Sequence, residues 1–434
     1  MKQKKFIIVL LIALLLVLAG CADAGGESGP SIGSVIGDFG KATDGETPPD
    51  AGSIDAMIGG EGMTYSPGTS DGSSDGGEQT TPQAGSLTAS VYFDNNHYDF
   101  WKTLINAQGD DAIFDTNYNS TAFNTLNRIK IVVPGIKNAK VTLMNTDNTS
   151  ALFTTYTDGD GNAFLFSPTI QDTYNINVSY TDNNGTVYSK DAELSEDGVI
   201  DLDVTSFQTN ETLDLMLVLD TTGSMGDEIN YLQAELDDVI SQVKTDNPNV
   251  IVRFALILYK DVNDAQDTYL IQDYDFTTDL AAQAANLELA GASGGGDFPE
   301  AVDEAMEKAV TLSWSEDSST KILLHVADAP SHDETIADWS TAVNSLTAKG
   351  VRIITVASSG IDKNTEGYFR SQSMISNGAY VYLTDDSGIG ETHEVPTLET
   401  KPVVEYLNAL LVRLINGYYS GSFEAAIPYN QSSE

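Results

Sequence analysis

The chain has 434 residues, of which 21 are Lys or Arg and 64 are Asp or Glu, so its formal net charge at pH 7 is −43. Such an acidic chain is repelled by phosphate backbones and anionic head groups, which argues against nucleic acid binding and against a basic membrane-binding patch. The length allows two or three domains. Cys21 is the sole cysteine, so no intramolecular disulfide can form.

The N-terminus reads as an export signal. Three lysines precede an apolar run from Phe6 to Leu18, and Leu18 begins the sequence Leu-Ala-Gly-Cys, which ends at Cys21. This pattern predicts a lipoprotein signal peptide over residues 1–20, with Cys21 as the lipidated first residue of the mature protein. A single transmembrane anchor is the alternative, but the run is short for a span of about 20 residues. We therefore expect an exported bacterial lipoprotein, anchored by an acyl chain such as palmitate in the outer membrane or the outer face of the plasma membrane.

Residues 21–86 are rich in Gly, Ser, Asp, Thr and Pro, as in the run from Ser70 to Gly77. A segment of this composition buries too little apolar surface to offset its ordering entropy. We predict a disordered tether whose roughly 60 residues have a mean span on the order of 40 Å.

Residues 87–210 have a β pattern, with short runs of β-branched and aromatic residues between Asn, Asp and Gly turns. The expected strands are 91–93, 129–133, 139–144, 163–166, 174–180 and 200–204. They predict a small all-β sandwich, and residues 139–180 are similar to immunoglobulin-like or prealbumin-like modules. A helix is expected within residues 97–108. Asp158, Asp160 and Asn162 imitate the start of a calcium loop, but Ala163 replaces the required glycine, which favours a hairpin turn.

Residues 211–418 alternate between strand and helix, which predicts a mostly parallel sheet with helices on both faces. The expected strands are 213–219, 250–258, 269–274, 322–326, 352–356 and 380–383, with 269–274 as an antiparallel edge strand. The expected helices lie near 227–244, 279–288, 299–312, 334–348, 364–376 and 402–416. Residues 419–434 are left as a C-terminal tail.

The first strand of this region ends in a loop that carries oxygen ligands. Asp220, Thr222 and Ser224 alternate where the strand passes into the loop, so their oxygens can converge on one hard cation. A carboxylate with neutral hydroxyls suits Mg²⁺ or Mn²⁺, and Ca²⁺ also takes oxygen ligands. An N-terminal helix cap is the alternative reading, since Asp, Thr and Ser are favoured there.

The loop resembles the Asp-x-Ser-x-Ser signature of von Willebrand factor A domains, a Rossmann-like α/β fold. Two further segments follow in the order of that family: 294–301, Gly-Gly-Gly-Asp-Phe-Pro-Glu-Ala, and 327–330, Ala-Asp-Ala-Pro. The resemblance implies a metal-ion-dependent adhesion site with Asp220, Thr222, Ser224, Asp297 and Asp328 as ligands. In this family the metal also accepts an acidic side chain of a protein partner.

The sequence departs from the family at Asp297, where many adhesion domains supply a threonine. Three carboxylates around one ion would tighten metal binding and weaken recruitment of an acidic partner. Glu300 lies close by, which leaves the alignment of Asp297 open.

These observations predict a cell-surface protein that binds a protein or matrix ligand, and not an enzyme. An envelope scaffold with a purely structural metal is the second hypothesis. A metal-dependent hydrolase is the third; it requires a general base, for which His332 and Glu300 are the candidates. His325, within a strand, is expected to be a hydrogen-bonded core residue.

Overall fold

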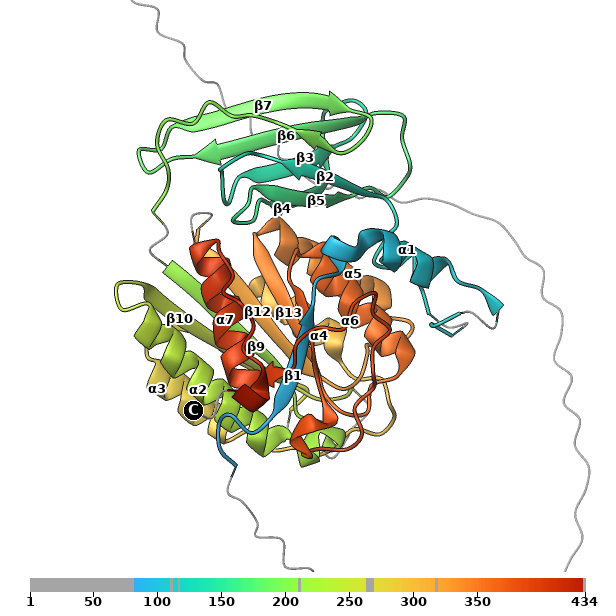
Figure 1. Ribbon diagram of the computed structural model, residues 1–434, viewed down its shortest axis with the longest axis vertical. Helices are drawn as coiled ribbons and strands as arrows, with labels where there is room; N and C mark the ends of the chain where they lie inside the picture. Colours follow the sequence, from blue (N-terminus) through green and yellow to red (C-terminus); the bar gives the residue numbers. More distant parts are fainter. Residues whose placement is uncertain are drawn as a thin grey trace, which may run out of the picture. The chain divides into compact units, whose positions relative to one another are not determined.

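A large mixed sheet, flanked by helices, forms the centre of the fold (Figure 1). The computed structural model describes residues 82–109, 112–115, 118–209, 212–262, 269–316 and 319–431. The predicted signal peptide, Cys21 and nearly all of the predicted tether lie outside these residues and stay predictions. The residues that the structure describes belong to one compact unit.

The large sheet has the strand order β11-β10-β9-β12-β13-β14-β1-β15. Five consecutive strands of this sheet run parallel to one another: β10, β9, β12, β13 and β14. Strand β11 pairs antiparallel with β10 at the edge, as predicted. The strands are β1 (Thr88–Tyr92), β9 (Thr212–Asp220), β10 (Ile251–Tyr259), β11 (Ile271–Thr277), β12 (Thr320–Ala327), β13 (Val351–Ala357), β14 (Ala379–Leu383) and β15 (Glu405–Tyr406). The interior strands are apolar on both faces because helices cover both.

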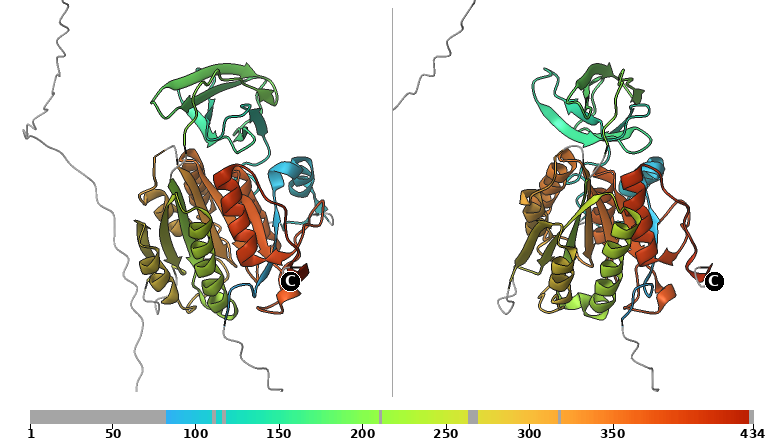
Figure 2. Two further views of the ribbon diagram at one scale, coloured as in Figure 1. Left: turned by 60° about the vertical axis from the view of Figure 1, so that its left-hand side comes forward. Right: turned by 90° about the vertical axis from the view of Figure 1, so that its left-hand side faces the viewer.

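Helices cover the two faces of the sheet in two groups of three (Figures 1 and 2). One face packs against α2 (Ile229–Asp246), α3 (Leu280–Glu288) and α7 (Leu407–Ser420). The other packs against α4 (Val302–Thr311), α5 (Ile336–Ala348) and α6 (Lys363–Ile375). Leu217 and Val218 show the division, since these neighbours on β9 belong to different apolar clusters. The mixed α/β fold with a mostly parallel central sheet is therefore confirmed.

The first described strand belongs to the large sheet, which corrects our expectation for residues 91–93. We placed them in the β-sandwich, but β1 pairs antiparallel with β14, with Val91 opposite Val381. Its far edge pairs with β15, where Ala89 lies opposite Glu405. The short β pattern of β1 identified a strand but held no information on its partner, because that partner is almost 300 residues away in the sequence.

Two smaller sheets lie between β1 and β9 in the sequence. One has the order β5-β2-β8 and the other β4-β3-β6-β7. Their strands are β2 (Arg128–Val132), β3 (Lys140–Met144), β4 (Ala151–Tyr156), β5 (Asn162–Phe166), β6 (Tyr174–Thr181), β7 (Val187–Leu194) and β8 (Gly198–Val199). The strand expected at 200–204 is wrong, because that segment has no strand and β8 ends before it. Strands β4 and β7 were not foreseen.

The turn after β4 is not a hairpin, which corrects a second expectation. Strand β4 pairs with β3 and strand β5 pairs with β2, so the turn leads from one small sheet to the other. Asp158 Oδ1 holds this turn by accepting the backbone N–H groups of Asp160 at 3.0 Å and Asn162 at 2.8 Å. These bonds explain the Asp and Asn residues there without a calcium ion.

Helix α1 (Tyr98–Asn106) forms where a helix was expected and buries Trp101 and Leu104. The Trp101 indole donates a hydrogen bond to Thr125 Oγ1 at 2.9 Å, and its ring lies under the guanidinium of Arg370. Among the described residues, no helix is long and apolar enough to cross a membrane.

Candidate functional site

The candidate site lies at the carboxyl ends of β9 and β12, two neighbouring parallel strands in the interior of the sheet. The chain leaves β9 toward β10 on one side, and β12 lies on the other side. This is the topological switch point at which open α/β sheets bind ligands. Asp220 is the last residue of β9, and Asp328 directly follows β12.

The loop after β9 folds its oxygens onto Asp220. Asp220 Oδ1 accepts hydrogen bonds from the backbone N–H of Thr222 at 2.9 Å and from its hydroxyl at 2.7 Å. The hydroxyls of Thr222 and Ser224 lie 3.2 Å apart. Asp220 and Thr222 are fully buried, whereas Ser224 is exposed. The predicted grouping of these three side chains is therefore observed, with Ser224 at its open side.

The glycine-rich loop lies directly against this loop. Gly223 donates its N–H to the carbonyl of Gly294 at 2.9 Å, and a Cβ at Gly223 would lie 2.8 Å from that oxygen. Ser293 donates its N–H to the carbonyl of Thr221 at 3.1 Å. Buried Lys260 ties both loops together, since its ammonium group donates to the Thr221 carbonyl at 2.6 Å and to Ser293 Oγ at 3.0 Å.

Glu300 is buried beside the site, whereas Asp297, which the sequence analysis named as a ligand, does not turn inward. Asp297 is exposed on the loop, whereas Glu300 is only 2% exposed. A Cβ at Gly295 would lie 3.0 Å from Glu300 Oε1 and 3.3 Å from Thr222 Cβ, so both side chains border this glycine. The N–H of Glu300 donates to the Pro330 carbonyl at 2.9 Å, which holds it beside the loop after β12.

Three buried carboxylate oxygens at this edge lack a hydrogen-bond partner among the described residues: Asp220 Oδ2, Glu300 Oε2 and Asp328 Oδ1. Burial raises the pKa of Asp220 to about 6. Burial, followed by the negative charge of Asp220, raises the pKa of Asp328 to about 8 and that of Glu300 to about 10. Each group therefore ionises at a cost that a nearby cation would offset.

The donor set fits a hard divalent cation in its chemistry, since it combines carboxylate and hydroxyl oxygens in a buried position. In the described part of the chain, no group of three or more His, Cys, Asp or Glu side chains is arranged to hold a metal ion. A metal ion at this place would therefore need the hydroxyls of Thr222 and Ser224 in addition to carboxylates.

Histidines near this edge have structural partners. His325 is fully buried, with its ring nitrogens 3.1 Å from the Tyr259 hydroxyl and 2.8 Å from Gln372 Nε2; this confirms it as a hydrogen-bonded core residue. Burial lowers its pKa to about 3. His332 Nε2 lies 2.8 Å from Asp261 Oδ1.

A second ionisable cluster joins the helix after the site loop to the segment after β14. His393 Nε2 lies 2.8 Å from Glu228 Oε1, and its Nδ1 lies 2.8 Å from Asp385 Oδ1. Burial lowers the pKa of His393, but the two carboxylates outweigh burial and the net shift is upward. Neither Glu228 nor His393 was singled out from the sequence, which offers no spacing signal for a pair 165 residues apart.

Comparison with known proteins identifies the domain that carries the site. The family model for the von Willebrand factor A domain matches residues 214–394. An alpha-protein kinase, vwkA, of Dictyostelium discoideum is 23% identical over 186 residues, which cover 43% of this chain and 29% of that protein. A putative ariadne-like RING finger protein, R811, of Acanthamoeba polyphaga mimivirus is 26% identical over 189 residues, which cover 39% of this chain and 18% of that protein.

Both matches span less than a third of the relatives' own length. Among solved structures, the conserved hypothetical protein BatB of Bacteroides thetaiotaomicron matches 39% of this chain and 89% of its own, with 13% identity and a TM-score of 0.31. The pilus adhesin SpaC of Lactobacillus rhamnosus GG matches 48% of this chain and 30% of its own, with 9% identity and a TM-score of 0.31. On the match to the family model alone, a von Willebrand factor A domain is found at residues 214–394 of this chain.

Proposed function

We propose that the von Willebrand factor A domain binds a protein partner through a divalent cation held at the carboxyl ends of β9 and β12. The observation that carries this proposal is the set of three buried carboxylate oxygens without hydrogen-bond partners among the described residues. Buried polar atoms are rarely left unpaired, and an ion absent from the coordinates is one reason for such atoms.

The proposed ligand set consists of Asp220, Thr222, Ser224 and Asp328, with Glu300 in place of Asp297, which the sequence analysis had named. The cation is Mg²⁺, with Mn²⁺ and Ca²⁺ as alternatives, because all donors are hard oxygens. When bound, the ion supplies a positive centre that accepts an oxygen of the partner, such as a carboxylate. Exposed Ser224 leaves this side of the site accessible.

Exposed Phe298 gives the same loop an apolar contact point. Its side chain is 42% exposed, next to Asp297 and two residues before buried Glu300. Large aromatic side chains of this kind contribute strongly to protein interfaces. A partner surface that combines one acidic side chain with an apolar contact fits this arrangement.

Metal titration followed by thermal unfolding tests the site. We expect Mg²⁺ or Mn²⁺ to raise the melting temperature of the full chain, because a ligand that binds only the folded state stabilises it. Asp220→Ala should abolish the rise. If wild type and Asp220→Ala respond equally to each ion, the metal proposal fails.

Partner binding needs a separate measurement. The full chain, immobilised with Mg²⁺, is used to capture envelope proteins, and the captured proteins are eluted with EDTA. A partner released by EDTA and not captured by Asp220→Ala supports metal-mediated binding. Under the alternative of an envelope scaffold with a structural metal, EDTA lowers the melting temperature but a partner stays bound to the folded chain.

We also propose that Cys21 is acylated after removal of residues 1–20, which anchors the chain in a bacterial envelope membrane. The support is the sequence pattern alone. Metabolic labelling with a palmitate analogue tests it: the wild type should be labelled and Cys21→Ser should not. Equal labelling of the two proteins would refute acylation at Cys21.

A further inference from the structure

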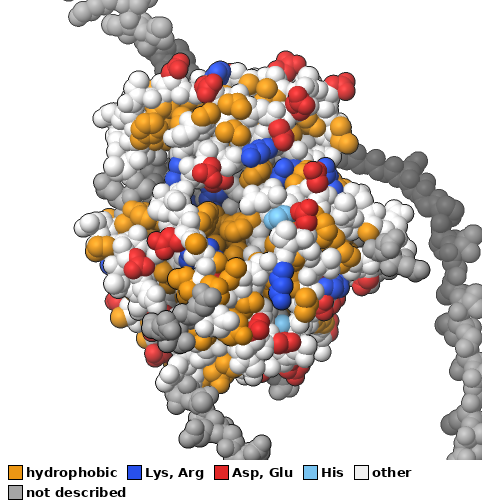
Figure 3. Space-filling view, viewed as in Figure 1, with side chains coloured by type: hydrophobic (Ala, Val, Ile, Leu, Met, Phe, Trp, Pro, Cys, Tyr) orange, Lys and Arg blue, Asp and Glu red, His pale blue; other side chains and the backbone are white. Residues whose placement is uncertain are grey.

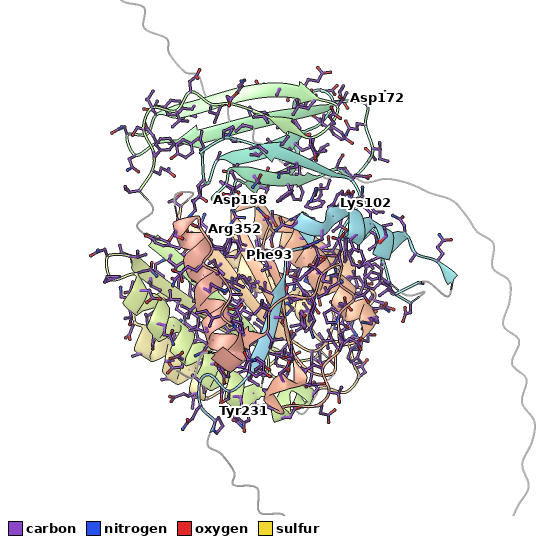
Figure 4. All side chains as sticks on the ribbon, in the orientation of Figure 1. Phe93, Lys102, Asp158, Asp172, Tyr231 and Arg352 are labelled. Carbon is purple, nitrogen blue, oxygen red and sulfur yellow. The ribbon has the colours of Figure 1, made fainter. Side chains whose placement is uncertain are left out.

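His393 joins a turn after β14 to the start of α2, at the edge of the sheet that carries the candidate site. Its ring lies between Glu228, which directly precedes α2, and Asp385, which opens a short helical turn (Asp385–Ser387). Figure 4 labels Tyr231 on the first turn of α2, and Figure 3 shows acidic side chains with a small histidine surface among them in the lower part of the view. Neither Glu228 nor Asp385 belongs to the proposed ligand set, so the function proposed above leaves this cluster unused.

The geometry around the ring requires a protonated histidine. Its Nε2 lies 2.8 Å from Glu228 Oε1, and its Nδ1 lies 2.8 Å from Asp385 Oδ1. An ionised carboxylate only accepts hydrogen bonds, and a neutral imidazole has one N–H to donate, whereas the imidazolium has two. Only the imidazolium can therefore donate to both carboxylates at once.

The charges that face the ring favour its protonated form. Burial lowers the pKa of His393, but hydrogen bonds to Glu228 and Asp385 and the negative charges of these two groups hold it above its ordinary value. A cavity of about 190 Å³ borders the ring, and its other charged lining residues are Asp386, Glu394 and Lys401. Because Asp385 is exposed and the cavity borders the ring, protons can reach the ring from solvent.

The irregular segment 388–393, which carries His393, packs directly on the chain that leaves the site loop. The N–H of Glu391 donates to Asp227 Oδ2 at 2.7 Å. Gly390 passes so close to Glu228 that a Cβ there would lie 2.2 Å from its Oε1. Asp227 ends the short 3-10 helix Gly223–Asp227, which also contains Ser224 of the site. The segment is thus attached to the same short stretch of chain that carries a proposed metal ligand.

We infer that His393 is a proton-dependent latch that holds segment 388–393 on the start of α2. With the ring protonated, both carboxylates are bound and the segment is closed. When the ring gives its proton to water, one nitrogen becomes an acceptor that faces a carboxylate oxygen, and that contact is lost.

The direction of the pH dependence follows from the raised pKa of His393. A group whose pKa is raised in the folded state stabilises that state at low pH, and the stabilisation is lost as the pH rises through the folded-state pKa. Rising pH therefore opens the latch and loosens the chain beside the site loop. The latch needs no bound metal ion, so it stands or falls independently of the metal site.

NMR titration of the histidine rings in the full chain, with EDTA present, tests the protonation step. The chain has four histidines, and the signal that is absent from His393→Gln assigns this ring. We expect His393 to titrate above the ordinary histidine pKa of about 6.5. In Glu228→Gln it should titrate lower than in wild type, because the amide carries no charge and can donate to the neutral ring.

Hydrogen exchange of segment 388–393, corrected for the intrinsic rate at each pH, tests the opening step. In wild type the protection should fall about tenfold or more between about pH 6 and about pH 8.5, as expected for the loss of a charge-assisted hydrogen bond. In Glu228→Gln and in His393→Gln the fall should be less than about threefold, because glutamine offers both a donor and an acceptor at either pH.

His97→Gln is the matched control, since it removes a histidine that is paired with Glu399 instead, and its segment 388–393 should exchange as in wild type. Exchange of β13 at the same two pH values separates local opening from a general loss of stability. The inference is overturned if His393 titrates at or below its ordinary value, or if Glu228→Gln keeps the wild-type pH dependence. It is also overturned if β13 loses as much protection as the segment, or if the segment of wild type is equally protected at both pH values.

Discussion

Glu235, in the middle of α2, accepts the backbone N–H of Leu87 at 2.8 Å across 148 residues of sequence. The same carboxylate accepts the N–H groups of Gly85 at 2.8 Å and Ser86 at 2.7 Å. Glu235 is fully buried and holds the entry to β1 against the helix. The start of β1, which lies between β14 and β15 in the sheet, is thereby fixed by one side chain.

We expect Glu235→Ala to lower the free energy of unfolding by about 3 kcal/mol, because the backbone N–H groups of residues 85–87 lose the carboxylate that accepts their hydrogen bonds. Glu235→Gln should cost less, since it keeps one acceptor oxygen. Asp237→Ala, an exposed acid on the same helix, is the control and should stay within about 0.5 kcal/mol of wild type. Urea unfolding of the three variants measures the change in the free energy of unfolding. Equal midpoints for Glu235→Ala and Asp237→Ala would show that Glu235 does not stabilise the start of β1.

Arg370 on α6 forms a buried ion network with the segment after β1. Its guanidinium lies 2.6 Å from Asp94 Oδ1 and 2.6 Å from Glu366 Oε1, and all three side chains are nearly inaccessible. Arg370→Met should cost about 3–5 kcal/mol, because two carboxylates remain buried without their cation. Lys102→Met, which breaks the exposed pair with Asp99, should cost about 1 kcal/mol or less. If thermal unfolding shows that both variants lose a similar amount of stability, the buried ion network does not stabilise the fold as expected.

The pH dependence of stability should differ with and without metal. The unfolded carboxyl groups have pKa values of about 4, whereas those of Asp328 and Glu300 are raised to about 8 and about 10. From about pH 5 to pH 8 the metal-free folded state therefore binds more protons than the unfolded state, and the free energy of unfolding falls as pH rises.

A divalent ion that replaces the protons on Asp328 and Glu300 should be accompanied by proton release on binding. It should also reduce the fall of the unfolding free energy with rising pH. Calorimetric titration of Mg²⁺ at pH 7 in buffers of different ionisation enthalpy measures the protons released. Heats that do not depend on the buffer would show that these carboxyl groups are not the binding groups.

The sequence predicted the parallel part of the large sheet because most of its strands alternate with helices along the chain, as β9 does with α2, whose apolar stripe is clear. It did not predict the place of β1, whose neighbours β14 and β15 are far away in the chain. Strand β7 was missed because its burial is irregular and mostly exposed, which leaves no alternating pattern.

At the site, Asp220, Thr222 and Ser224 were predictable because one short loop holds them together. Asp297 and Glu300 were not distinguishable, since they lie three residues apart and nothing in their spacing fixes which side chain turns inward. Glu300 is the buried one of the two, and its N–H donates to the Pro330 carbonyl, a contact that joins two separate loops.

Glu300→Gln and Asp297→Asn separate the two acids by experiment, since each removes one charge and keeps the side-chain size. Because Glu300 is buried beside Thr222 and Asp297 is exposed, we expect Glu300→Gln to weaken Mg²⁺ binding at least tenfold, or about 1.4 kcal/mol. Asp297→Asn should change the affinity less than about threefold, as expected for a screened surface charge. Without metal, Glu300→Gln should be more stable than wild type at pH 8, since the amide needs no proton, whereas the carboxyl group with its pKa raised to about 10 must take up a proton on folding at this pH. Thermal shift with Mg²⁺ titration measures both quantities, and the reverse order of the two variants would restore Asp297 as the ligand.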